Sequence, residues 1–256
     1  MTPPSAPLEG GIDAHCHLDD PTLDAKEMRR LRPTGAEAIN PSSARPKDEP
    51  QGFVCAGFSP ERWPAQKAIQ LPNVWHAVGL HPWAEVSWDP ATLERELEQG
   101  WAVAVGECGL DFARERSPER RAEQKRVLAA HLRLARKAEL PVVLHVVRAH
   151  QAVLELLDQA GPAAGMVHGF AGPIEQARDF LVRGLYLSIG PFSLRRPEVL
   201  RELPSDRILA ETDAPGRGAH LADLDTVLQA IAEARGGTAR EWAEITADNA
   251  RRLLKI

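Results

Sequence analysis

A regular alternation of short apolar segments with amphipathic segments constrains the fold of this chain of 256 residues more than any other feature. The short segments are typical of buried strands, and the segments between them carry apolar residues at helical spacing. Strands are expected in an initial run that ends at His15-Cys16-His17, and then at 53–58, 74–81, 102–108, 141–147, 164–169, 184–189 and 207–212. Eight strands alternating with helices predict an α/β protein whose parallel sheet closes into a (β/α)8 TIM barrel.

The expected helices lie between these strands. The clearest start is at Ser117-Pro118, because serine is a good N-cap and proline suits the first helical turn. The other helices are expected at 23–31, 61–71, 91–99, 149–159, 174–182, 197–203, 221–234 and 239–254, with a break near Asp248 as an open alternative. Prolines punctuate 32–52, which we expect to be an exposed loop, although 35–40 is an alternative to 53–58 for the second strand.

Length and composition indicate one domain over residues 1–256, with 1–10 as a flexible N-terminal stub. The apolar runs are far shorter than the ~20 residues of a membrane helix, and no secretory signal is recognisable, so we expect no membrane association. A net charge of −5 argues against nonspecific coating of nucleic acid but leaves a local basic rim open. The three cysteines are expected to be buried, reduced thiols of a cytoplasmic protein.

Side chains that suit divalent metal ions stand at the ends of five expected strands. In the first strand, alternation puts Asp13, His15 and His17 on one face and Ile12, Ala14 and Cys16 on the other. The carboxyl ends of parallel strands form the active mouth of a barrel, so we expect imidazoles and carboxylates there to converge on one or two ions such as Zn, Mn or Mg. The candidate ligands are His15, His17, Glu107, His145, His168 and Asp213.

Two further expectations follow from these positions. Glu107, on a strand midway round the ring, is the natural bridge between two ions. The remaining histidines are expected to be structural or surface residues, and they are His76, His131, His150 and His220.

The order of these motifs resembles the TatD family of metal-dependent hydrolases, from Gly11 to Pro215. The matching stretches are His15-Cys16-His17, Gly-Leu-His81-Pro, Gly-Glu107-Cys-Gly-Leu-Asp111, Leu-His145, His168-Gly-Phe-Ala-Gly and Glu-Thr-Asp213-Ala-Pro. The resemblance implies an amidohydrolase-like barrel with one or two divalent ions that hydrolyses phosphodiester bonds in DNA. It puts the six candidate ligands on the family's ligand positions, and His81 near the substrate phosphate.

Two stretches depart from the family pattern. The segment 32–52 is expanded, and 216–220 reads Gly-Arg-Gly-Ala-His where the family often has an aromatic residue, an Arg-Asn pair and a proline. Both stretches are expected in loops that face substrate, so they bear on which substrate is bound more than on the chemistry.

The expected reaction is hydrolysis by a water whose pKa a metal ion lowers. Asp213 and Glu107 are the expected catalytic residues, because Asp213 would take the proton from the water and Glu107 would fix the spacing of the ions. His81 and Arg148 are expected to bind the substrate phosphate, with a salt bridge at the barrel rim as the alternative for Arg148. Trp83 is expected to pack beneath its own loop, with stacking on a base as the alternative.

The expected substrate is DNA or another small phosphodiester, bound by a monomer. One alternative is the same metal chemistry on an amide, an ester or a lactone, because a barrel does not determine its substrate. The other is a noncatalytic binding protein, which the complete ligand set disfavours.

Overall fold

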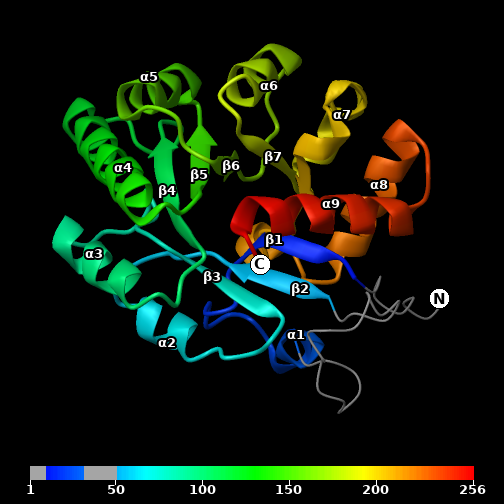
Figure 1. The fold of residues 1–256 in the computed structure, drawn as a ribbon, viewed down its shortest axis with the longest axis horizontal. Coiled ribbons are helices and arrows are strands. Elements are labelled where there is room, and N and C mark those ends of the chain that lie inside the picture. Colours follow the sequence, from blue (N-terminus) through cyan, green and yellow to red (C-terminus); the bar gives the residue numbers. More distant parts are fainter. Residues whose placement is uncertain (1–9, 32–50) are drawn as a thin grey trace.

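A computed structural model describes residues 10–31 and 51–256, and these ranges contain a sheet of eight parallel strands (Figure 1). Each strand is hydrogen-bonded to the next one in the chain, so the order in the sheet is the order in the sequence. The strands are β1 (Ile12–Cys16), β2 (Gly52–Cys55), β3 (Val74–Val78), β4 (Ala104–Asp111), β5 (Val142–Val147), β6 (Gly165–Val167), β7 (Tyr186–Ile189) and β8 (Ile208–Ala210).

The sheet closes into a barrel because the end of β1 is hydrogen-bonded to the residues that follow β8. The backbone amide of Asp213 donates to the carbonyl oxygen of His15 over 2.9 Å, and the amide of His17 donates to the carbonyl oxygen of Ala214 over 2.7 Å. This seam confirms the predicted (β/α)8 barrel, and it brings the first and last candidate ligands in the chain next to each other.

Helices follow the strands round the outside of the barrel (Figure 1). The α-helices are α1 (Ala25–Arg30), α2 (Trp63–Lys67), α3 (Pro90–Glu98), α4 (Pro118–Ala138), α5 (His150–Ala160), α6 (Ile174–Leu181), α7 (Pro197–Glu202), α8 (Asp223–Arg235) and α9 (Ala239–Leu254). Three short 3-10 helices that the sequence did not predict lie on either side of β8, and they are η1 (Ser193–Arg195), η2 (Ser205–Arg207) and η3 (Gly216–Gly218).

Two helices show how well local signals predict boundaries. Helix α4 begins where expected, with the Ser117 hydroxyl accepting from the backbone amide of Arg120. Helix α9 runs unbroken through Asp248, which pairs with Arg251 one turn further on. The helix continues there because one of its faces, which includes Ala247 and Leu254, packs against the strands.

The barrel interior is filled by apolar side chains. One cluster contains residues from all eight strands, which is possible only on the faces that point to the barrel axis, and α9 completes it. A second cluster joins the outer faces of strands β3 to β8 to the surrounding helices, and a third covers the outer faces of β1 to β3. The three cysteines are free and buried in these two outer clusters, away from the candidate ligands, as predicted.

The predicted alternation in the first strand is wrong at one point. The pairing of β1 with β2 shifts between Asp13 and Cys16, where β1 holds one residue more than its partner. Ala14 therefore packs in the interior cluster while Cys16 packs in an outer one. The Asp13 carboxylate binds the end of β8, accepting from the Thr212 amide at 3.0 Å and hydroxyl at 2.6 Å. Because of this β-bulge, the side chain of His15 points to the centre although that of Asp13 does not.

The second strand is β2, close to the preferred range 53–58. The alternative strand 35–40, most of the predicted loop 32–52 and residues 1–9 of the predicted stub lie outside the described residues. Within the described ranges, no helix is both long enough and apolar enough to cross a bilayer.

Candidate metal centre

The six predicted ligands converge at one end of the barrel, where the strands that carry them finish. Glu107 lies in the middle of β4 and His145 near the end of β5, His168 follows β6 directly, and Asp213 lies three residues beyond β8. Each side chain has a nitrogen or oxygen atom 2.7 to 3.6 Å from another member of the set, which consists of His15, His17, Glu107, His145, His168 and Asp213.

Glu107 lies between two groups of histidines. Its Oε2 atom is 3.0 Å from Nε2 of His15 and 3.4 Å from Nε2 of His17. Its Oε1 atom is 2.7 Å from Nδ1 of His145 and 2.8 Å from Nε2 of His168. Asp213 belongs to the first group, with Oδ1 at 3.6 Å from Nε2 of both His15 and His17. Each oxygen of one carboxylate thus faces its own set of donors.

The donor atoms of the centre fit divalent cations. Nε2 of His15 and Oε2 of Glu107 are buried and form no hydrogen bond among the described residues, although the two atoms lie 3.0 Å apart. A buried polar atom without a partner costs free energy, and a cation bound between these side chains would supply the partner. Imidazole and carboxylate are also the ligands that zinc and manganese accept. The predicted ligands all occur in groups of three side chains whose donor atoms lie within 4.8 Å of one another.

The electrostatics of the centre favour a cation. Burial alone would raise the pKa of Glu107, but the surrounding histidines hold it well below its usual range. Burial would likewise raise the pKa of Asp213, and its hydrogen bond with His17 lowers it instead. Burial alone would lower the pKa of His17, whereas Asp213 and Glu107 raise it to about 10. Protons and metal ions therefore compete for the same side chains.

Two carboxylates outside the predicted set hold ligand histidines from behind. Asp111 Oδ2 is 3.4 Å from Nε2 of His145, on the ring edge opposite the atom that faces Glu107. Glu211 Oε1 is 3.4 Å from Nδ1 of His168 and accepts from the Gly169 amide at 2.6 Å. Such partners fix the orientation of a ligand imidazole. Both residues belong to the motifs quoted above, so the sequence marked them as members of the family pattern. Their spacing did not indicate that they would support ligand histidines.

His81 approaches the centre as a neutral hydrogen-bond donor. Its Nδ1 atom accepts from the backbone amide of Trp83 at 3.0 Å, and its Nε2 atom is 3.1 Å from Oε1 of Glu107. Burial lowers the pKa of His81 to about 4, so the ring is neutral. A neutral imidazole that accepts at Nδ1 carries its proton on Nε2. That proton leaves no lone pair on Nε2 for a metal and makes His81 a donor toward the centre.

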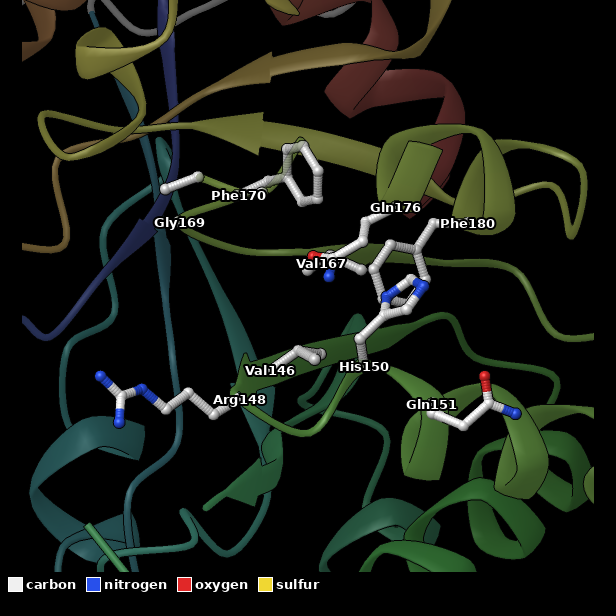
Figure 2. Close-up of a pocket in the computed structure, with 11 residues that line it drawn as sticks. Val146, Arg148, His150, Gln151, Val167, Gly169, Phe170, Gln176 and Phe180 are labelled. Carbon is white, nitrogen blue, oxygen red and sulfur yellow. The ribbon is translucent and has the colours of Figure 1, made fainter. Parts of the chain in front are cut away.

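The centre lines a cleft of about 780 Å³, and a recess of about 380 Å³ adjoins it beside the first turns of α5 and α6. Arg148 lines both spaces, and in Figure 2 its side chain points away from His150 and Phe180 at the other end of the recess. No described carboxylate pairs with its exposed guanidinium, so the structure offers no rim salt bridge for it.

Trp83 is half-buried and lines the cleft, where the end of β4 and the segment after it hold its ring. Its indole nitrogen donates to Oδ2 of Asp111 at 2.7 Å, and the guanidinium of Arg114 lies 4.6 Å from its ring.

The four histidines that were expected to be structural or surface residues all have contacts away from the centre, and these are His76, His131, His150 and His220.

Comparisons with known proteins agree with this geometry. The family model described as "TatD related DNase" matches residues 12–255. The chain is 30% identical to the "uncharacterized metal-dependent hydrolase YabD" of Bacillus subtilis, over 96% of this chain and 99% of that protein. It is 37% identical to the "3'-5' ssDNA/RNA exonuclease TatD" of Escherichia fergusonii, over 75% of this chain and 82% of that protein.

A solved structure supports the same assignment. The crystal structure of YJJV, a TatD homologue from Escherichia coli, superposes with a TM-score of 0.82 at 26% identity, covering 97% of this chain and 99% of that one. With a family match over almost the whole chain, a barrel of eight strands and a buried cluster of metal-binding side chains, this protein belongs to the TatD family and is a metal-dependent hydrolase.

Proposed function

We propose that this enzyme is a nuclease that hydrolyses phosphodiester bonds of single-stranded nucleic acid. The observation that carries the proposal is the position of Glu107, whose two oxygens face separate sets of donors. A pair of ions held in this way suits displacement at phosphorus, where the attacking and leaving oxygens both need stabilisation. The relative from Escherichia fergusonii, named as an exonuclease on single-stranded DNA and RNA, supports the same substrate class.

In this proposal the six ligands divide between two ions. His15, His17 and Asp213 would hold one ion, and His145 and His168 would hold the other on the opposite side of Glu107. Bound divalent ions supply positive charge to the phosphate oxygens and make the attacking water more acidic. Asp111 and Glu211 keep the rings of the second pair in place.

Asp213 is the best candidate for the residue that takes a proton from the attacking water. Its pKa lies below the usual value, so it is ionised at neutral pH. Both carboxylates line the cleft, but the side chain of Asp213 is 28% exposed whereas that of Glu107 is 1% exposed and enclosed by histidines. A water in the cleft can therefore reach Asp213, and Glu107 is left to position the ions.

Two groups are suited to hold the scissile phosphate. His81 presents an N–H from Nε2 toward the centre, and it keeps this proton at neutral pH because its pKa is about 4. Arg148 lines the same cleft with an exposed guanidinium, whose planar set of donors matches a phosphate. In this proposal both residues keep the role that we expect from the sequence.

We further propose that the enzyme works as a monomer in the cytoplasm. One chain supplies every candidate ligand and the lining of the cleft. The free thiols of Cys16, Cys55 and Cys108 suit a reducing compartment.

The test compares substrates under a set of divalent ions. A 5'-labelled single-stranded oligonucleotide is incubated beside a panel of amides, esters and lactones, with Mg²⁺, Mn²⁺ or Zn²⁺. We expect the oligonucleotide to be shortened, and Asp213→Asn to remove that activity, which excludes a contaminating nuclease. A higher kcat/KM for an amide, ester or lactone than for the oligonucleotide would overturn the proposed substrate class.

A further inference from the structure

We propose that the cleft contains a second anion subsite, formed by Arg195 of η1, Arg217 of η3 and the ring of Phe192 between them. This subsite binds a phosphodiester of the substrate strand next to the one that is cleaved. The identity of the ligand rests on the proposed function, whereas the subsite itself rests on the contacts and charges of these three side chains.

Phe192 holds both guanidinium groups at the cleft. The guanidinium carbon of Arg195 lies 5.2 Å from the centre of the Phe192 ring, and that of Arg217 lies 4.9 Å from it. These are the distances of cation–π contacts, which orient a cation without neutralising it. All three side chains line the same cleft as Asp213.

The charges around the cleft leave these two arginines without a counter-ion. The rim carboxylates are already committed, since Asp20 pairs with Arg62 at 3.2 Å and Glu198 lies 4.0 Å from Arg196. Among the described residues, no carboxylate pairs with the guanidinium of Arg195 or Arg217. A chain with a net charge of −5 thus gathers unneutralised positive charge at its cleft, which is expected where an anion binds.

The backbone of Arg217 points to the same role. Its φ of 53° is in the left-handed region, which costs free energy for any residue with a side chain. Of the five described non-glycine residues with positive φ, Glu139 and Lys255 end helices, and the other three line the cleft; these are Arg148, Asp213 and Arg217. Arg217 also lies in 216–220, one of the two stretches that depart from the family pattern.

The position of the subsite indicates which phosphate it takes. His81 and Arg148 follow β3 and β5, whereas η1 and η3 follow β7 and β8, across the mouth of the closed barrel. A strand whose scissile phosphate contacts His81 and Arg148 therefore needs another phosphate to reach Arg195 and Arg217. A guanidinium pair matches a phosphodiester in both charge and donor geometry.

The test removes both charges. Arg195→Gln/Arg217→Gln is compared with wild type and with Arg133→Gln/Arg240→Gln, a control that removes two exposed arginines from α4 and α9. Binding of a fluorescent, cleavage-resistant phosphorothioate oligonucleotide is measured by anisotropy at several salt concentrations. Hydrolysis is measured on a normal oligonucleotide and on bis(p-nitrophenyl) phosphate, which has a single phosphate and therefore no second one for the subsite.

We expect Arg195→Gln/Arg217→Gln to weaken oligonucleotide binding at least tenfold, the effect of removing one charge-assisted hydrogen bond. The slope of log affinity against log salt should fall by about 0.7 for each phosphate that the variant no longer neutralises. The ratio of kcat/KM for the oligonucleotide to that for the small diester should also fall about tenfold. The control variant should bind and cleave like wild type.

The outcomes separate this inference from the proposed function. If Arg195→Gln/Arg217→Gln binds the oligonucleotide with the affinity and the salt slope of wild type, the subsite is overturned, even if the enzyme is a nuclease. Weaker binding in that variant, with no cleavage of the normal oligonucleotide by wild type, supports the subsite and overturns the proposed function. An equal decrease in the control variant would show a general charge effect and would also overturn the subsite.

Discussion

His131 gives a quantitative prediction about stability, because its surroundings define its protonation state. Its Nε2 atom accepts from the backbone amide of Leu80 at 3.0 Å, and Nδ1 donates to the carbonyl oxygen of Val127 at 2.8 Å. The ring stacks on Trp88 with centroids 4.6 Å apart. Burial lowers the pKa of His131 to about 4, so the folded protein holds it neutral down to that pH.

The sign of the effect follows from proton uptake by the unfolded chain. Below the ordinary histidine pKa of about 6.5, the unfolded chain binds a proton at His131 that the folded protein does not bind until pH 4. Stability therefore falls as the pH falls through this window, by about 1.4 kcal/mol per pH unit from this residue. The total loss is about 3 kcal/mol and is complete near pH 4.

The assay compares wild type with His131→Gln, which cannot titrate. Unfolding in urea, followed by tryptophan fluorescence, gives the free energy of unfolding of both proteins at pH 7 and pH 5. Other titrating groups, including the metal centre, are common to both proteins and cancel in the difference. We expect the stability of wild type relative to the variant to decrease by about 2 kcal/mol between these pH values. A difference that changes by less than about 0.5 kcal/mol would show that the fold does not hold His131 neutral.

Four further predictions concern the metal centre. Chelation should abolish hydrolysis and a divalent ion should restore it, and full activity in protein shown by metal analysis to be metal-free would contradict this. Asp213→Asn should lower kcat by about 10²–10⁴-fold while keeping the fold and much of the metal, whereas a wild-type rate would mean that another group takes the proton. Glu107→Gln should lose metal as well as turnover, because the bridge needs both carboxylate oxygens; wild-type metal content would argue against bridging. Asp111→Asn should lower metal affinity about 10–100-fold by weakening the support of His145, measured by competition with a chromogenic chelator.

Much of the fold and of the site could be predicted because both follow from periodic patterns. The strand–helix alternation determines which strands are neighbours in a parallel barrel, and strand ends meet at one mouth. His145 and His168 could therefore be placed together although nothing local connects them, and the structure confirms their proximity at 3.1 Å.

Other features depend on contacts that no periodic pattern reports. Asp13-Ala14-His15 reads as simple alternation, and only the pairing with β2 shows the bulge that takes Asp13 away from the centre. Asp111 was visible as a motif residue, but its role depends on the side on which it meets the ring of His145. The contact of Arg195 with Phe192 depends on η1, a turn too short to have a periodic signature.

The seam between β1 and β8 has a consequence for biosynthesis. Synthesis runs from the N-terminus, so His15 and His17 leave the ribosome long before Asp213 is made. The bond that ties the end of β8 to β1, from the Thr212 amide to Asp13, joins residues 199 positions apart. An ion held by these histidines and Asp213 would therefore meet its full ligand set only once β8 has emerged, and a nascent chain released before that point can neither close the barrel nor complete the candidate centre.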